Sequence, residues 1–138
     1  MIVLDTNVLS EPMRPVPDPR VMDWFDAQDG QDLWITAIVA AELWAGVAKL
    51  SVGSRRNGLQ EQVEATLHEF DGRILAFDED AAFVYGALVG PLLAKRMPYE
   101  VLDYQIAAIT LVNGGTLATR NIKHFADTGV PLFNPWEA

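Results

Sequence analysis

Short apolar runs alternate along the chain with longer segments whose apolar residues recur at helical spacing. The short runs are mostly aliphatic or aromatic and predict β-strands at residues 1–4, 33–35, 73–77, 116–119 and 131–133. The longer segments predict helices at about residues 8–13, 19–27, 37–50, 59–70, 80–96, 101–113 and 122–126. Residues 51–58 are polar and predict a surface loop.

This alternation of strands and helices predicts a parallel sheet with helices on both faces. The expected fold class is therefore α/β, a three-layer α/β/α sandwich formed as a single domain by residues 1–138. The carboxyl ends of parallel strands share one edge of the sheet, and open α/β sheets bind their ligands at that edge. Polar residues that directly follow a strand are therefore the first candidates for a functional site.

Composition excludes several kinds of site. The chain has 138 residues and no cysteine, which rules out disulfides, thiolate metal sites and a cysteine nucleophile. No apolar run reaches membrane-spanning length, and Asp5 interrupts the position of a signal-peptide core, so we expect a cytoplasmic protein. The net charge of −9 argues against loose binding of nucleic acid and favours a basic partner. It is compatible with a nucleic-acid enzyme whose acids hold metal ions.

Three acidic residues stand in apolar sequence. Asp5 directly follows the first strand, Glu42 lies in a helix that is otherwise apolar on every face, and Asp103 lies in the first turn of a second apolar helix. Each has a structural alternative: Asp5 caps a helix, Glu42 meets an arginine or solvent, and Asp103 complements the helix dipole. Beside Asp103, the small residues Ala107 and Thr110 share its stripe and leave room for a metal or substrate.

Grouping the three carboxylates favours a hard divalent cation. Without cations they repel each other and their pKa values rise, and Mg²⁺ or Mn²⁺ relieves this because both ions prefer oxygen ligands. The chain has only two histidines and no cysteine, so a zinc site is not expected. Such an acid-only site suits hydrolysis of a phosphodiester by an activated water.

The ordered motifs of the chain resemble the PIN-domain family, in particular the VapC-type toxin ribonucleases and their FitB-like branch. The matching segments cover essentially the whole chain: Ile2–Asn7, Ile38–Leu43 with Gly46, Ile74–Asp78, Asp103–Ala108, Ala118–Asn121 and Phe133–Trp136. The resemblance implies a Mg²⁺- or Mn²⁺-dependent endoribonuclease with Asp5, Glu42 and Asp103 as metal ligands. It also implies a supporting role for Thr6, whose hydroxyl can orient a ligand or a water.

The sequence departs from the family pattern at one position. Asn121 stands where the family has a fourth acid, so the site has one negative charge fewer and a second metal is in doubt. Asn121 can still orient a water or ligate through its carbonyl oxygen, and capping a helix is the alternative. Arg120 is a candidate for RNA phosphate contact or a solvated arginine. For His124 we favour a surface histidine over a phosphate contact.

The resemblance further implies a homodimer and a cognate antitoxin. Such antitoxins contact DNA through an N-terminal part, so that the toxin meets DNA only indirectly, and lay a basic C-terminal segment across the toxin. Candidates for that groove are Trp24, Trp44, Val47 and Leu50, for each of which we favour core packing instead.

Two other functions compete with the nuclease. A phosphatase with an aspartate nucleophile needs a second acid two residues after the first, and Asn7 occupies that position. The second is a catalytically weak PIN-like binding module that acts through its antitoxin or nucleic acid, an alternative supported by the missing fourth acid.

Overall fold

The computed structural model describes residues 1–138 and contains one sheet of five parallel strands in the order β3-β2-β1-β4-β5. This confirms the α/β class predicted from the sequence. The strands are β1 (Ile2–Leu4), β2 (Leu33–Thr36), β3 (Ile74–Leu75), β4 (Thr116–Ala118) and β5 (Leu132–Phe133).

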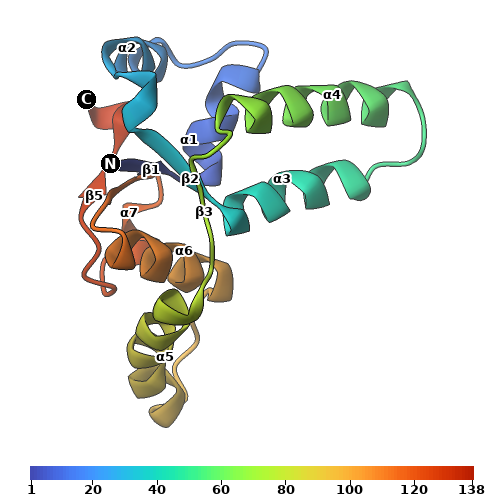
Figure 1. Ribbon diagram of the computed structural model, residues 1–138. Helices are drawn as coiled ribbons and strands as arrows, with labels where there is room; N and C mark the ends of the chain where they lie inside the picture. Colours follow the sequence, from blue (N-terminus) through green and yellow to red (C-terminus); the bar gives the residue numbers. More distant parts are fainter.

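Seven helices surround this sheet. They are α1 (Thr6–Ser10), α2 (Pro19–Ala27), α3 (Ala37–Ala48), α4 (Ser54–Glu69), α5 (Glu79–Ala94), α6 (Val101–Val112) and α7 (Ile122–Phe125). Short 3₁₀ helices cover Glu11–Met13, Gly30–Asp32 and Pro135–Glu137. Figure 1 shows α1, α2 and α4 on one side of the sheet and α6 and α7 on the other, with α3 and α4 forming a hairpin that extends sideways. None of the helices is both long and apolar enough to cross a membrane.

The N-terminal strand lies at the centre of the sheet because its residues pair on both sides. Val3 is in register with Trp34 of β2 and with Leu117 of β4. Val3, Leu4 and Leu117 are completely buried and belong to a single hydrophobic core. Burying each such aliphatic side chain contributes about 1.5–3 kcal/mol to the stability of the fold. The burial holds β1 in the centre of the sheet and thereby positions Asp5, the residue that follows it.

The order of the strands across the sheet changes direction at β1. The chain proceeds outward from β1 to β2 and β3, and then returns to the other side of β1 to form β4 and β5. Neighbouring connections therefore leave β1 in opposite directions, which opens a crevice at its carboxyl end. The functional site is expected at this point.

Several helices differ from their sequence-based boundaries. The predicted loop at residues 51–58 is wrong in its second half, because α4 already begins at Ser54 and carries Arg55 and Arg56 in its first turn. α3 was predicted to be buried on every face, but only Val39, Leu43 and Val47 of this helix are buried. Its small alanines made the sequence uniformly apolar, although a helix at the side of a sheet buries only one stripe.

Three polar side chains cap helices at the carboxyl edge of the sheet. The side chains of Asp5, Thr36 and Asp78 accept hydrogen bonds from backbone N–H groups at the starts of α1, α3 and α5, respectively. A side-chain cap of this kind contributes about 1 kcal/mol to helix stability. The caps at the ends of β1 and β2 set the direction in which α1 and α3 leave the sheet.

Candidate active site

Asp5 lies at the end of β1, at the reversal of the strand order. Its backbone N–H donates to the carbonyl of Ala118 at 2.9 Å, so the pairing with β4 continues one residue past the strand. The residue is 5% exposed. The backbone ladder therefore fixes the position of a nearly buried carboxylate.

The carboxylate of Asp5 accepts three hydrogen bonds. The backbone N–H of Thr6 donates to Oδ1 at 2.8 Å, and the hydroxyl of Thr119 and the amide of Asn7 donate to Oδ2 at 2.7 and 3.3 Å. Burial raises the pKa of Asp5, while the hydrogen bonds from Thr119, Thr6 and Asn7 and the nearby His124 oppose that rise. Asp5 thus both caps α1 and presents a carboxylate whose oxygens are held in fixed directions.

Glu42 lies in the second turn of α3 and reaches toward the same edge. Its Oε1 accepts a hydrogen bond from the Thr6 hydroxyl at 3.0 Å, and no arginine or lysine forms a salt bridge with it. Burial raises the pKa of Glu42, and the negative charges of Asp5 and Asp103 raise it further. Thr6 therefore connects two of the candidate ligands, as its predicted supporting role requires.

Asp103 lies in the first turn of α6, where its Oδ2 forms a hydrogen bond of 3.1 Å with Nδ1 of His124. Burial raises the pKa of Asp103 and Asp5 adds to the rise, whereas His124 lowers it. The negative charge of Asp5 therefore raises the pKa values of both Glu42 and Asp103, and the charge of Asp103 also raises that of Glu42. Three distant parts of the sequence thus bring three carboxyl groups to one edge of the sheet.

The donor set fits a hard divalent cation. All the candidate ligands are carboxylate oxygens with raised pKa values, and a cation at their centre offsets both burial and mutual repulsion. The structure does not bring three acid or histidine side chains together closely enough to hold a metal ion as they stand. Glu42 and Asp103 are only partly buried, which leaves their side chains freer to change rotamer than that of Asp5.

Asn121 and Arg120 follow β4 at the same edge. The Thr119 hydroxyl accepts a hydrogen bond from the backbone N–H of Asn121 at 3.0 Å while donating to Asp5, which ties Asn121 to the acidic centre. Asn121 occupies the N-cap position of α7 as the capping alternative predicts, but its side chain makes no capping hydrogen bond there. Arg120 is exposed, and its guanidinium lies over the ring of Trp136 at 4.9 Å.

Other sequence-based interpretations need correction. Ala107 and Thr110 are completely buried, so their stripe packs inside the molecule and leaves no room for a ligand. The prediction that Trp44 packs in the core is wrong, because its side chain is 39% exposed. Val47 is buried as predicted, and Trp24 packs against the core. Leu50 is only partly buried.

Two residues at the site escaped the sequence reasoning. Thr119 donates the shortest hydrogen bond to Asp5, but the sequence places it only in a strand and in the family motif Ala118–Asn121 and predicts no role for its hydroxyl. A polar residue at the carboxyl end of a strand is a usable signal. His124 was interpreted as a surface histidine, but it contacts Asp103. Its partner is 21 positions away in the sequence, and no local pattern indicates that pairing.

A family model for the PIN domain matches residues 2–130. The chain belongs to the PIN-domain family. Among curated PIN-domain relatives, it is 44% identical to the plasmid stability protein StbB of Pseudomonas syringae pv. tomato, over 100% of both chains. It is 42% identical to toxin FitB of Neisseria gonorrhoeae, over 99% of both chains. It is also 39% identical to VapC ribonuclease Y4jK of Sinorhizobium fredii, again over 99% of both.

Solved structures agree with this membership of the PIN-domain family. The structure superposes on a chain of the FitAcB crystal structure from Neisseria gonorrhoeae with a TM-score of 0.91, 41% identity and complete coverage of both chains. It superposes on a chain of FitAB bound to an IR36 DNA fragment with a TM-score of 0.89 and 41% identity, covering 99% of this chain and 96% of the other. The PIN fold is therefore shared over the entire length, including the edge that carries the three acids.

Proposed function

We propose that this PIN-domain protein is a metal-dependent endoribonuclease toxin of a type II toxin–antitoxin pair. The observation that carries the proposal is the arrangement of Asp5, Glu42 and Asp103 at the strand-order reversal, each with a raised pKa. The relatives support it, since their names include a toxin and a VapC ribonuclease.

The proposed metal ligands are Asp5, Glu42 and Asp103, and the proposed ion is Mg²⁺, with Mn²⁺ as a substitute. When bound, the ion supplies positive charge that activates a water and offsets charge on the scissile phosphate. The chain's own residues place the carboxylates: Thr119 and the Thr6 backbone orient Asp5, and the Thr6 hydroxyl orients Glu42. In the proposed mechanism the side-chain amide of Asn121 would orient a water, and the hydrogen bond from its backbone N–H to Thr119 holds the residue beside Asp5.

The test is cleavage of mixed cellular RNA by the purified protein with Mg²⁺, with Mn²⁺ and with EDTA. Asp5→Asn keeps the side-chain volume but removes a charge from the centre, so we expect cleavage to fall by at least about 100-fold. Asn121→Asp restores the fourth acid, and we expect it to lower the metal concentration needed for half-maximal cleavage. Circular dichroism confirms that both variants are folded.

A contrary result has a definite meaning. If the folded protein cleaves no RNA with either metal, or if Asp5→Asn cleaves as well as the wild type, the nuclease proposal is wrong. The binding-module alternative then gains support, because Asn121 and the absence of a ready-made metal cluster both favour weak metal binding.

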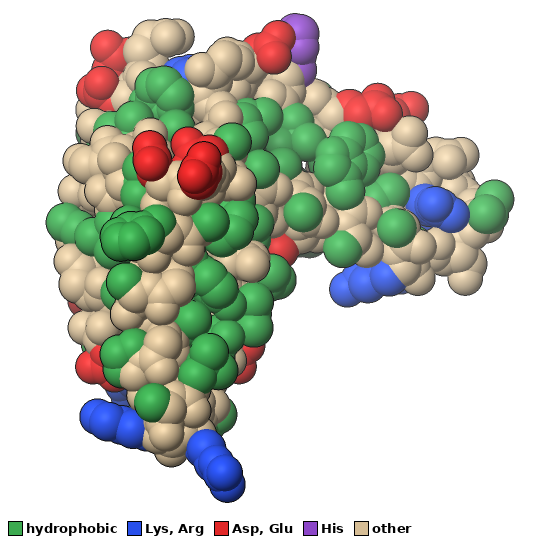
Figure 2. Space-filling view, turned by 60° about the horizontal axis from the view of Figure 1, so that its bottom comes forward, with side chains coloured by type: hydrophobic (Ala, Val, Ile, Leu, Met, Phe, Trp, Pro, Cys, Tyr) green, Lys and Arg blue, Asp and Glu red, His purple; other side chains and the backbone are tan.

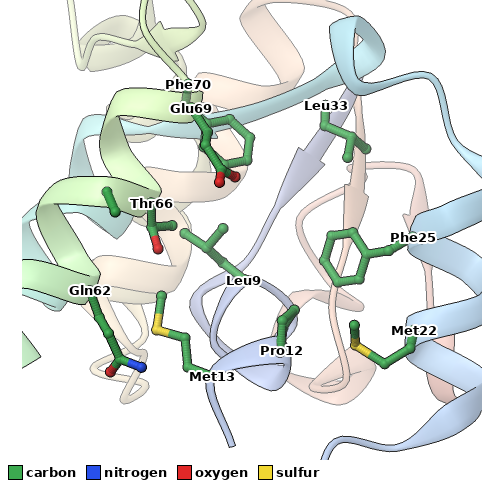
Figure 3. Close-up of a pocket in the computed structure, with 11 residues that line it drawn as sticks. Leu9, Pro12, Met13, Met22, Phe25, Leu33, Gln62, Thr66, Glu69 and Phe70 are labelled. Carbon is green, nitrogen blue, oxygen red and sulfur yellow. The ribbon is translucent and has the colours of Figure 1, made fainter.

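A groove between α1, α2 and α4 supports the proposed antitoxin partner. It is a cavity of about 460 Å³ whose lining is mostly apolar, with the carboxylate of Glu69 at one side (Figure 3). Figure 3 shows Leu9, Met13, Phe25 and Phe70 directed toward the open space. A cognate antitoxin with a basic, partly apolar C-terminal segment suits both this lining and the net charge of −9. DNA contact then occurs only through the antitoxin.

The proposed homodimer has a different surface. Large apolar side chains on α5 and α6 are exposed, with Phe83 at 80% and Leu93 at 59%. The face in Figure 2 carries a broad band of hydrophobic side chains, with lysine and arginine at its projecting ends. Association of two copies through such a band removes apolar surface from water.

A further inference from the structure

A second pocket adjoins the acidic centre and differs from it in charge. It has a volume of about 300 Å³ and opens beside α7 and the C-terminal turn. Its polar lining consists of Arg120, Asn121, Lys123, His124, Asn134 and Glu137. Three of these side chains are basic and one is acidic, in a chain whose net charge is −9.

Hydrogen bonds attach this pocket to the acidic centre. His124 lines the pocket and contacts Asp103, so the two sites share a wall. The backbone N–H of Arg120 donates to Oδ1 of Asn7 at 3.2 Å, while the amide of the same Asn7 donates to Asp5. The basic pocket therefore has a fixed position relative to the candidate catalytic carboxylates.

The two strongest cations of the pocket are not neutralised by salt bridges. In the whole structure only Arg14 and Arg20, among the lysines and arginines, have a carboxylate oxygen within 4.0 Å. Lys123 is exposed without such a partner, and Arg120 is held by the ring of Trp136, which orients the guanidinium without cancelling its charge. Together with Arg20, Arg120 also helps lower the pKa of Asp18, but it forms no salt bridge with it. Positive charge beside an acidic centre attracts an anion and directs it to one side of that centre.

We propose that this pocket binds an RNA phosphate next to the scissile one, with Arg120 and Lys123 as its contacts. The inference rests on the proposed ribonuclease function for the identity of the substrate. The volume of the pocket, about 300 Å³, is at the lower end of the range for small-molecule sites and suits a single nucleotide unit. The pocket thereby compensates for the repulsion between an acidic catalytic centre and a polyanionic substrate, and it determines the direction in which the RNA strand crosses the site.

The experiment measures equilibrium binding of a fluorescein-labelled single-stranded RNA, by anisotropy, to protein carrying Asp5→Asn so that the probe stays intact. Adding Lys123→Ala should weaken binding about fivefold at 0.1 M salt and reduce the slope of log K against log salt by about 0.7, the loss of one phosphate contact. Lys95→Ala, at the exposed end of α5, is the matched control and should change neither quantity.

A second variant is expected to change RNA binding in the opposite direction. Glu137→Gln removes the single acid of the pocket and should tighten RNA binding several-fold, whereas a residue with a purely structural role gives no gain. If Lys123→Ala and Lys95→Ala bind RNA equally and Glu137→Gln has no effect, the pocket proposal is overturned. Cleavage of cellular RNA by the wild type is measured separately. If the wild type cleaves RNA but Lys123→Ala and Glu137→Gln leave RNA binding unchanged, only the pocket proposal is refuted. Altered binding without cleavage supports the pocket and refutes the nuclease.

Discussion

Thr119 connects the two strands that form the candidate site. Its hydroxyl donates to Asp5 and accepts from the backbone of Asn121, and its side chain is completely buried. A hydroxyl in this position satisfies one lone pair of a carboxylate that burial would otherwise push toward its neutral form. We therefore regard Thr119 as a positioning residue for Asp5.

The substitution Thr119→Val tests this role, because valine has nearly the same shape but cannot form hydrogen bonds. We expect the metal concentration for half-maximal RNA cleavage to rise about 10-fold, the usual effect of losing an outer contact to a ligand. The control is Thr128→Val, which removes a buried hydroxyl that donates to the carbonyl of Phe125 and accepts from the backbone N–H of Val130. An equal effect of both variants on metal dependence would contradict a specific role for Thr119.

The sequence predicted the three candidate acids and the supporting Thr6, but it missed Thr119 and His124, which also contact these acids. Asp5, Glu42 and Asp103 are visible because each is a charge in apolar sequence, which is costly without a purpose. Thr119 and His124 carry no such signal, since a threonine in a strand and an exposed histidine are ordinary. Their roles depend on strand pairing and on contacts between distant segments, which periodicity does not determine.

The sequence predicted the number and order of the helices around the site. It did not predict which helix faces are exposed to solvent. A helix of alanine, valine and leucine looks the same in sequence whether one face or all faces are buried, as α3 demonstrates. The start of α4 was missed because its first turn is polar and contains two arginines, which the pattern alone assigns to a loop. Both differences arise because packing against a neighbouring helix decides burial and helix length.

The groove between α1, α2 and α4 gives a prediction about how these helices bind the proposed antitoxin. Ala65→Arg places a long cation in the groove, from an exposed position where the added side chain does not disturb the core. We expect the variant to lose binding of a basic antitoxin segment by at least about 10-fold through steric overlap and repulsion. RNA cleavage should be unchanged.

Isothermal titration with the cognate antitoxin measures the effect of Ala65→Arg. Gln60→Arg is the control, because it adds the same charge to the same helix at an exposed position outside the groove. Equal losses in both variants would indicate a general charge effect and would contradict the groove as the docking site.

Across the whole molecule, the acidic centre lowers stability at neutral pH. The pKa values of Asp5, Glu42 and Asp103 are raised in the folded chain, so on acidification the folded state binds protons before the unfolded state does. The free energy of unfolding from these groups therefore increases as the pH falls from neutral through their folded values, and the gain ends near their ordinary values of 3.8 and 4.5.

Glu42→Gln isolates one part of this effect. Glutamine keeps an oxygen for the Thr6 hydroxyl but has no charge, so we expect the metal-free variant at pH 7 to melt about 3–5 °C above the wild type. Added Mg²⁺ should stabilise the wild type more than the variant. Calorimetry with and without Mg²⁺ measures both effects, with the exposed Glu64→Gln as the control. A variant that melts no higher than the wild type would refute the idea that charge at this position opposes folding.

The central position of β1 also affects when the protein becomes active during its synthesis. The first strand leaves the ribosome early, but its partner β4 begins at residue 116, and the hydrogen bond from Thr119 to Asp5 spans 114 positions. A nascent chain lacking its last fifth has neither that strand nor the hydroxyl that orients the carboxylate. A contact of such long range forms only after almost all of the chain has emerged. Under the proposed function, we therefore expect the growing chain to leave the RNA around it uncut until translation is nearly complete, and the proposed antitoxin has that interval in which to bind.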